Sequence, residues 1–412
     1  ERIKKLKRSS LEKHRGEIIS IEKIDQETIF KTFAKVIQRG ALRLQQKHSQ
    51  EIKDKKVSIG LVRMANINPL VAVAKELLKL EVNKSDVRIH LCVYHSRYPL
   101  AIRSYLEKNL DAILKRNSKK TNWPPNEFVD KVDSYPEKNQ IFIVLASPVA
   151  EVGRDHDYDW AIIEPSSMRS IIQIAGRVLR HRETKPQCKN ILLLDKNIKC
   201  LNSNEICFEK PGFEIKKNDL YLKKHDLEST LHEEQYQKIS SIQRIIEPDN
   251  YKEKAKLNLV ALEHKSLLET LFASESAAKL WWKKKPYWSG EIQKQQKFRD
   301  SKKDEAFYLI LEGGEPKWLW KNEKVYPAKW GEISGAGFNI THREDVCFSN
   351  RVGFWFDLSA ENIYEKLADD FKKDIKDVGR LFGEVRLVNY KERDIGSFLY
   401  SQNLGLYQEV VL

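Results

Sequence analysis

The stretch SSMRSIIQIAGRVLRHR, at residues 166–182, carries the pattern that decides the fold of this chain. Apolar side chains recur in it at i, i+1, i+4, i+7 and i+8, a spacing that places them on one side of a helix. They are Ile171, Ile172, Ala175, Val178 and Leu179. The pattern predicts a single amphipathic helix over 166–182, with this apolar stripe packed against a core.

The opposite side of the same helix carries the polar and charged residues that could bind a ligand. Positions i, i+3, i+4 and i+7 share that side, and they are occupied by Gln173, Gly176, Arg177 and Arg180. A guanidinium is a planar fork of donors that keeps its charge, so it can hold phosphate oxygens at two points. We therefore expect this face to meet a polyanion. The simpler alternative is a solvated charged face, which many helices have.

The segment upstream of the helix reads as two strands joined by a glycine turn. Residues 141–146 form a continuous apolar run, typical of a strand buried on both faces, and a second run follows at 160–163. Ligands of open α/β sheets bind beyond the carboxyl ends of the strands. There, the hydroxyl of Ser147 can bond a nucleic-acid phosphate. Beyond Gly153, Asp155 can accept from a ribose hydroxyl or hold an arginine.

The same alternation of strands and helices extends over residues 16–200. The expected strands are 18–24, 57–63, 87–95, 141–146, 160–163 and 190–195. The expected helices are 26–48, one with Asn68 as N-cap and Pro69 in its first turn, 98–115 and 166–182. Residues 117–140 are polar and proline-marked, so we expect a loop there. With right-handed crossovers, this order gives an α/β fold, a parallel sheet covered by helices.

Outside that lobe, the pattern changes three times. Residues 1–15 are basic and polar, which suggests a linker or a frayed start. Residues 201–256 predict a linker that includes a helix near 228–246, and residues 257–412 predict a smaller α+β C-terminal domain. Six of the nine tryptophans lie between 281 and 330 among lysines. They could stack bases, but we favour core packing for each one. Lys297 and Arg299 are better candidates for DNA contact.

The strand–turn–strand segment and the helix that follows it resemble those of a known family. The segments SPVAEVGRD and QIAGRVLR are similar to motifs V and VI of superfamily 2 helicases, which lie in the second RecA-like lobe. The longer string at 151–182 resembles the Cas-three helicase–nuclease of subtype I-F CRISPR systems. Residues 60–78 and 93–110 resemble its motifs IV and IVa. The resemblance is dense over 57–195 and weaker around 280–301, where the family's C-terminal domain begins.

The resemblance implies a role for each candidate residue in a nucleotide site. Arg180 and Arg177 would reach the γ-phosphate of an ATP held by another lobe, and Gln173 would orient or sense the nucleotide. Gly153 would let the backbone approach, while Asp155 would bond the ribose or position an arginine.

The resemblance also implies residues that track DNA. These are Ser147, Arg154, Ser96, Arg97, Arg63 and Asn66. They stand at or just after predicted strand ends, where they can touch phosphates without reading bases. Asn66 has an equal alternative as a turn or cap residue.

The family's activity, carried over, is ATP-dependent 3′-to-5′ DNA unwinding with nuclease cleavage of single-stranded DNA in CRISPR interference. Its implied partners are single-stranded DNA, the RNA-guided surveillance complex and the adaptation integrase. No Gly-x-x-x-x-Gly-Lys-Ser/Thr loop occurs in the 412 residues. We therefore expect ATP and Mg²⁺ to be held mainly by a first lobe outside this chain. The divalent metal of an HD nuclease would also lie outside this chain. The isolated chain should be inactive.

Two other classes of function stay open at this point. The chain could be a nucleic-acid-binding module without turnover, or part of an unrelated superfamily 2 RNA or DNA motor. Its net charge of +14 suits polyanionic partners in each case.

Composition adds limits of its own. No apolar run approaches the ~18 residues of a membrane span, so we expect no membrane partner. Five cysteines without a Cys-x-x-Cys pair indicate a reducing, cytoplasmic setting. A zinc site from Cys188, Cys200 and Cys207 is the alternative to our expectation of no metal site.

Overall fold

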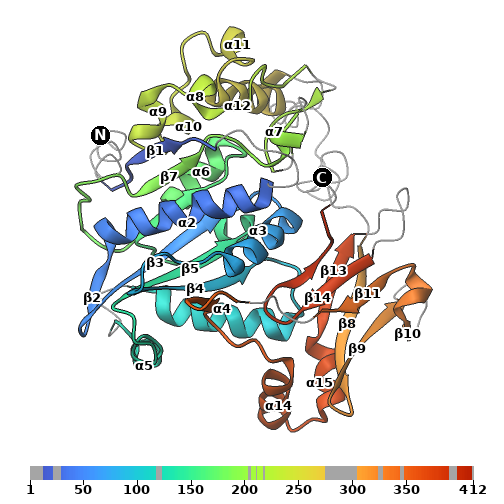
Figure 1. The fold of residues 1–412 in the computed structure, drawn as a ribbon. Helices are drawn as coiled ribbons and strands as arrows, with labels where there is room; N and C mark the ends of the chain where they lie inside the picture. The colour runs from blue at the N-terminus through green and yellow to red at the C-terminus, as the bar shows by residue number, and fades with distance from the viewer. Residues whose placement is uncertain are drawn as a thin grey trace.

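The computed structural model describes residues 13–21, 29–116, 123–202, 206–209, 211–216, 219–273, 304–322, 328–343, 348–388 and 397–410. A parallel sheet with helices on both faces forms the larger part, and a unit with one antiparallel and one mixed sheet lies beside it (Figure 1). No helix within these ranges is both long enough and apolar enough to cross a membrane.

The main sheet follows the order β1-β7-β6-β3-β5-β4-β12, with every neighbouring pair parallel, and β2 adds to β3 in antiparallel fashion. Its strands are β1 Gly16–Ile19, β2 Gln50–Ile52, β3 Lys55–Arg63, β4 Val87–Tyr94, β5 Asn139–Ala146, β6 Trp160–Ile163, β7 Ile191–Leu194 and β12 Val352–Phe354. The continuous apolar runs are buried on both faces because helices cover both, which confirms the predicted parallel α/β sheet.

Helices cover the two faces in separate groups. On one face, α2 (Ile29–His48) and α3 (Ile67–Lys79) share a core with alternate strand residues such as Ile141 and Ile143 (Figure 1). On the other face lie α4 (Leu100–Leu114), α5 (Asn126–Asp133) and α6 (Met168–Ala175), packed with Phe142 and Val144. The expected loop at 117–140 is thus partly helical. Phe128 and Val132 explain this, because both bury their side chains in that core.

A helical segment follows the last parallel strand. It contains α7 Lys199–Asn202, α8 Leu227–Thr230, α9 Glu233–Gln237, α10 Ile242–Ile245, α11 Tyr251–Lys254, α12 Leu259–Leu268 and a π-helical turn at Glu269–Ala273. The single helix predicted near 228–246 is replaced by three short ones. Asp226 caps α8 and His232 forms a capping box with Gln235, so each starts a separate helix. Two helices of this segment, α10 and α12, pack against α6. The segment therefore covers α6 and is more than a linker.

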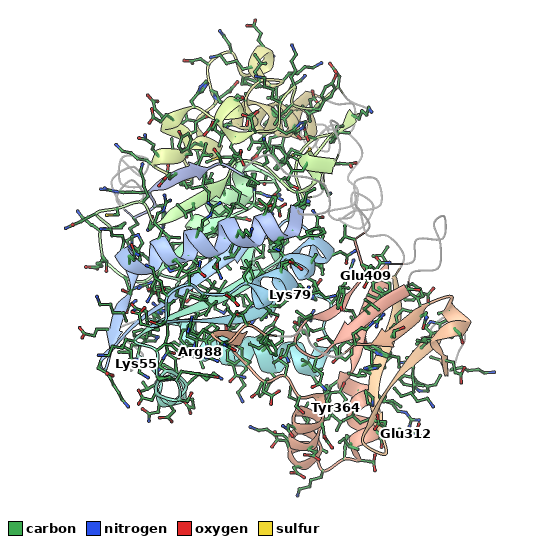
Figure 2. All side chains as sticks on the ribbon, in the orientation of Figure 1. Lys55, Lys79, Arg88, Glu312, Tyr364 and Glu409 are labelled. Atoms are coloured by element: carbon green, nitrogen blue, oxygen red, sulfur yellow. The ribbon has the colours of Figure 1, made fainter. Side chains whose placement is uncertain are left out.

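The C-terminal region is an α+β unit, as predicted. One antiparallel sheet has the order β10-β9-β8-β13, and a smaller mixed sheet has the order β11-β14-β15, with β11 parallel and β15 antiparallel to β14. The bounds are β8 Asp304–Glu312, β9 Glu315–Asn322, β10 Lys329–Glu332, β11 Asn339–His342, α14 Ala360–Phe371, α15 Ile375–Phe382, β13 Glu384–Val388, β14 Ser397–Ser401 and β15 Gly405–Tyr407. Tyr364 of α14, labelled in Figure 2, donates from Oη to the carbonyl of Leu309 in β8 at 2.9 Å and ties helix to sheet.

The two parts interlock where a boundary between separate domains was expected. Strand β12 comes from the C-terminal region but pairs with β4 at the edge of the main sheet, through Val352 opposite Ile89. Just after it, Trp355 packs its ring 4.9 Å from that of Phe142 in β5. One apolar cluster therefore runs through both parts, and a boundary near residue 257 does not divide the core.

Candidate functional site

A pocket of about 480 Å³ opens beyond the carboxyl ends of three neighbouring strands, β3, β5 and β4. Because parallel strands end at one edge of the sheet, the loops that follow them meet there. The pocket is lined by Ala65, Asn66, Ile67, Asn68, Pro69, Ser96, Arg97, Ser147, Pro148 and Val149. Four of the six residues predicted from the lobe to track DNA are among these, namely Asn66, Ser96, Arg97 and Ser147.

Local capping places two of these side chains. Asn66, and not the expected Asn68, is the N-cap of α3, and its amide makes no capping hydrogen bond. Ser147 is the N-cap of the short 3-10 helix Pro148–Glu151, where Oγ accepts from the backbone N–H of Val149 at 3.5 Å. The Ser147 hydroxyl still has its own proton to donate. Both positions thus present short polar groups and helix-start amides, which suit a phosphate.

Arg97 supplies the positive charge of the pocket. Its Nη1 donates to Oδ1 of Asn68 at 2.8 Å, and the guanidinium carbon lies 5.6 Å from the ring centre of Phe398. These contacts hold the half-buried side chain against the wall of the pocket. The neighbouring Ser96 is exposed at the rim.

Arg63 and Arg154 do not join this pocket. Arg63 is fully buried: Nη2 forms an ion pair with Glu151 at 2.8 Å, and Nη1 donates to the carbonyl of Glu164 at 2.9 Å. The prediction that Arg63 touches DNA does not fit this position, because a guanidinium so enclosed stabilises the loops after β5 and β6 instead. Arg154 lies apart too, in ion pairs with Glu107 and Asp111 of α4.

The predicted helix over 166–182 is wrong in its second half. Helix α6 ends at Ala175, with Gly176 as its C-cap, and the chain continues through turns as a non-helical tail. Val178 forms a parallel bridge with Tyr158, just before β6, and Leu179 donates to the carbonyl of Tyr158 at 2.9 Å. The apolar stripe is buried as expected except for the half-buried Ile172, but its last two members belong to this tail.

The two arginines of the tail consequently occupy different environments and do not form one ridge. Arg177 is 7% exposed, and its Nη2 donates to the carbonyl of Glu151 at 3.0 Å. Its Nη1 is buried and has no hydrogen-bond partner among the described residues. A buried donor of this kind is costly unless a ligand satisfies it. Arg177 therefore has an unused donor that fits an anionic group.

Arg180 is the accessible arginine, with 40% of its side chain exposed. Its Nε donates to Oδ1 of Asp155 at 2.7 Å, and the imidazole Nε2 of His181 lies 3.0 Å from the same oxygen. Partial burial would raise the pKa of the Asp155 carboxyl, but Arg180 and His181 together hold that pKa below its usual value. Of the two roles expected for Asp155, holding an arginine is the one seen here.

The remaining nucleotide candidates surround this pair. Gly153 is exposed in a left-handed turn with φ +78°, and nothing lies within 4 Å of where a side chain would begin. Gln173 is half-buried on α6. Lys297 and Arg299 lie outside the described residues. The described part of the chain holds no group of three or more His, Cys, Asp or Glu side chains that could bind a metal ion.

Sequence reasoning missed a buried ion cluster that fixes the arginine tail. The carboxylate of Asp159 accepts from Arg116 Nη1 at 2.7 Å and Arg182 Nη1 at 2.6 Å, while Arg182 Nη2 lies 2.7 Å from Asp157. Burial would raise the pKa of Asp159, yet Arg116 and Arg182 keep it below its usual value. The signal available was acidic DHDYD at 155–159 against basic RHR at 180–182.

Comparison with known proteins gives consistent matches. Residues 56–183 match the family described as CRISPR-associated nuclease/helicase Cas3, C-terminal. The chain is 37% identical over 354 residues to the CRISPR-associated nuclease/helicase Cas3 subtype I-F/YPEST of Pectobacterium atrosepticum, covering 83% of this chain and 31% of that protein. It is 35% identical to the Pseudomonas aeruginosa protein of the same name, covering 82% and 31%. A crystal structure of a CRISPR-associated protein aligns over 98% of this chain and 41% of that one, with 10% identity and a TM-score of 0.38. The chain spans less than a third of the curated relatives' length.

Proposed function

This chain belongs to the C-terminal part of the CRISPR-associated nuclease/helicase Cas3 family, and we propose that it supplies the second motor lobe and C-terminal domain of an ATP-dependent DNA helicase–nuclease in CRISPR interference. In this proposal, the pocket at the strand ends grips the backbone of single-stranded DNA. The arginine tail contributes to a nucleotide held mainly by another lobe. Identity of 37% over most of the chain favours this function over an unrelated superfamily 2 motor.

One observation carries the proposal for DNA: Asn66, Ser96, Arg97 and Ser147 come from three separate loops and line a single pocket. The groups on offer are two hydroxyls, an amide and a guanidinium. They can hold phosphate oxygens by hydrogen bonds and charge, and none of them needs a particular base. A motor that moves along any sequence requires contacts of this kind.

The nucleotide role rests on the two arginines. The buried Nη1 of Arg177 has no hydrogen-bond partner among the described residues, and Arg180 can exchange the exposed carboxylate of Asp155 for a γ-phosphate. A guanidinium placed there neutralises charge on the phosphoryl group as it is transferred, an effect on the order of 10³–10⁵ in turnover in other enzymes. Mg²⁺ would be held with the phosphates by the other lobe and would supply further positive charge.

The activities that need the rest of the protein are proposed for the full-length protein only. These are DNA-stimulated ATP hydrolysis, unwinding, nuclease cleavage, recruitment by an RNA-guided surveillance complex and association with the adaptation integrase. The chain by itself should bind single-stranded DNA without hydrolysing ATP above background. Appreciable DNA-stimulated ATP hydrolysis by the 412-residue chain would contradict the proposal that hydrolysis needs the rest of the protein.

Binding of fluorescently labelled single-stranded DNA to the full-length protein tests the proposed site. Arg97→Ala should raise the Kd by about five- to tenfold and lower the slope of log K against log salt by about one, because one phosphate contact is lost. Arg43→Ala is the charge-matched control, since Arg43 pairs with Glu17 on the surface of α2. Equal Kd values and equal slopes for the two variants would rule out the pocket as the site of strand binding.

A further inference from the structure

The C-terminal hairpin, β14 and β15 with the turn between them (residues 397–407), docks on the loop that carries Ser96 and Arg97. Strand β15 donates to this loop directly, from the backbone N–H of Leu406 to the carbonyl of Arg97 at 2.8 Å. In the other direction, Tyr98 Oη donates to the carbonyl of Asn403 in the hairpin turn at 2.7 Å. Residues about 300 positions apart in the chain are thereby joined beside the pocket.

A buried histidine links the loop to the hairpin through both ring nitrogens. His95 Nε2 lies 2.8 Å from the carbonyl of Leu404, and Nδ1 accepts from the backbone N–H of Arg97 at 3.1 Å. A carbonyl can only accept, so the proton is on Nε2. Burial lowers the pKa of His95 to about 3, so the ring stays neutral at any working pH. One side chain therefore fixes the turn at Arg97 and attaches it to the hairpin.

A glycine allows this close approach. Gly405 has φ +68°, and a Cβ built there would lie 2.6 Å from Cε1 of His95 and 2.9 Å from the carbonyl oxygen of Arg97. Both distances are shorter than a real Cβ contact. Any side chain at this position would push the hairpin and the loop apart.

The chain after the hairpin continues to the pocket wall. Oδ1 of Asn68 accepts from Nη1 of Arg97 at 2.8 Å and from the backbone N–H of Gln408 at 3.2 Å. The same oxygen thus orients the pocket's guanidinium and anchors the C-terminal tail. A shift of the tail would change the acceptor that holds Arg97.

We propose that the C-terminal hairpin is a positioning element of the strand-binding pocket, and that His95 and Gly405 are positioning residues that fix Ser96 and Arg97 for phosphate contact. The proposal rests on the proposed function of the pocket. It makes the far C-terminus part of the DNA site although it contributes none of the side chains that line the pocket.

Gly405→Ala in the full-length protein tests this, with Gly313→Ala as matched control. Gly313 has a similar φ of +64°, but nothing lies within 4 Å of its Cβ position, so alanine meets a left-handed φ in both variants and only Gly405→Ala disturbs the loop. Gly405→Ala should raise the Kd for labelled single-stranded DNA about tenfold, since small misplacements of binding groups have effects of this order. The DNA concentration for half-maximal ATPase should rise equally, with kcat at saturating DNA and KM for ATP within about twofold. Gly313→Ala should leave all four values within about twofold.

Two histidine variants provide a second route if Gly405→Ala fails to fold. His95→Gln keeps a donor near the Nε2 position and can restore the bond to the hairpin, whereas His95→Asn keeps only an acceptor near Nδ1. We expect the Gln variant to bind DNA within about threefold of wild type and the Asn variant about tenfold more weakly. Equal binding by both histidine variants, or by both glycine variants, would overturn the positioning role. Loss of binding in Arg97→Ala would then still support the pocket, whereas wild-type protein that binds no single-stranded DNA would overturn both proposals.

Discussion

Replacing Asp159 with asparagine should destabilise the protein strongly. The carboxylate is 2% exposed and faces two arginines, Arg116 and Arg182, while Oδ2 accepts from the backbone N–H of Ile59 at 2.6 Å. Asparagine has nearly the same size, so no cavity forms. It lacks the charge that both guanidiniums need, and its –NH₂ group faces donors. The change therefore isolates the electrostatic part of the interaction.

The expected loss can be set from the burial of the pair. Removing one partner of a buried ion pair costs about 3–5 kcal/mol. Here Arg182 keeps its ion pair with Asp157, but the buried guanidinium of Arg116 loses the carboxylate that it contacts. Asp377→Asn makes the same chemical change at an exposed ion pair with Arg380, where the side chains are 55% and 40% exposed. Solvent screens such a pair, so its loss should cost about 0–1 kcal/mol.

Urea unfolding of the 412-residue chain, followed by tryptophan fluorescence, measures both variants. The pKa of Asp159 is lowered in the folded state, so the stability it contributes is present above about pH 4 and is lost as pH falls further through the folded pKa. The difference in the free energy of unfolding between wild type and Asp159→Asn should hence become smaller at acidic pH. A loss no larger than that of Asp377→Asn at pH 7, or a gap that does not change with pH, would refute the reasoning.

Three further outcomes are expected. Arg180→Ala in the full-length protein should reduce ATP hydrolysis about 10³-fold or more with the Kd for single-stranded DNA within about twofold, and unchanged hydrolysis would remove the γ-phosphate role. Gly60→Ala should lower the free energy of unfolding by about 1–3 kcal/mol, seen as a lower urea midpoint, because its Cβ would lie 2.2 Å from the ring of Trp160. Burial raises the pKa of Glu263 to about 7 despite Arg244. Wild type should therefore lose stability relative to Glu263→Gln as the pH rises from about 4 to 7. Urea midpoints of the two proteins that stay parallel across that range would contradict this pKa-linked loss of stability.

The parallel sheet was predictable because its strands carry their own signal. Continuous apolar runs such as 141–146 can be buried only between two layers of helix, and the order of elements then sets the topology. The same rule places Ser96 and Ser147 in loops that meet at one edge, whereas the choice of Asn66, Ser96 and Arg97 as DNA-contacting residues came from the family resemblance. Local sequence was sufficient for the sheet.

Features that depend on distant partners were not predictable. The periodicity at 166–182 suits a helix throughout, but Val178 pairs with Tyr158 and Leu179 adopts φ +50°, so the tail leaves the helix. Arg63 ends a strand and Arg97 follows one, so their positions in the sequence look alike. Arg63 is nevertheless buried in the core, because it forms an ion pair with Glu151, which is distant in the sequence. The role of His95 was likewise hidden, because its partner Leu404 is about 300 residues away.

The placement of β12 has a consequence for how the protein is made. Strand β4 is complete about 260 residues before β12 leaves the ribosome, a delay on the order of 10–50 s at typical rates of synthesis. During that time, the nascent lobe presents a bare row of backbone donors and acceptors along β4. Exposed rows of this kind recruit strands from other chains. Newly made chains should therefore be most prone to aggregate in this interval, and a chaperone that shields β4 should raise the yield of folded protein.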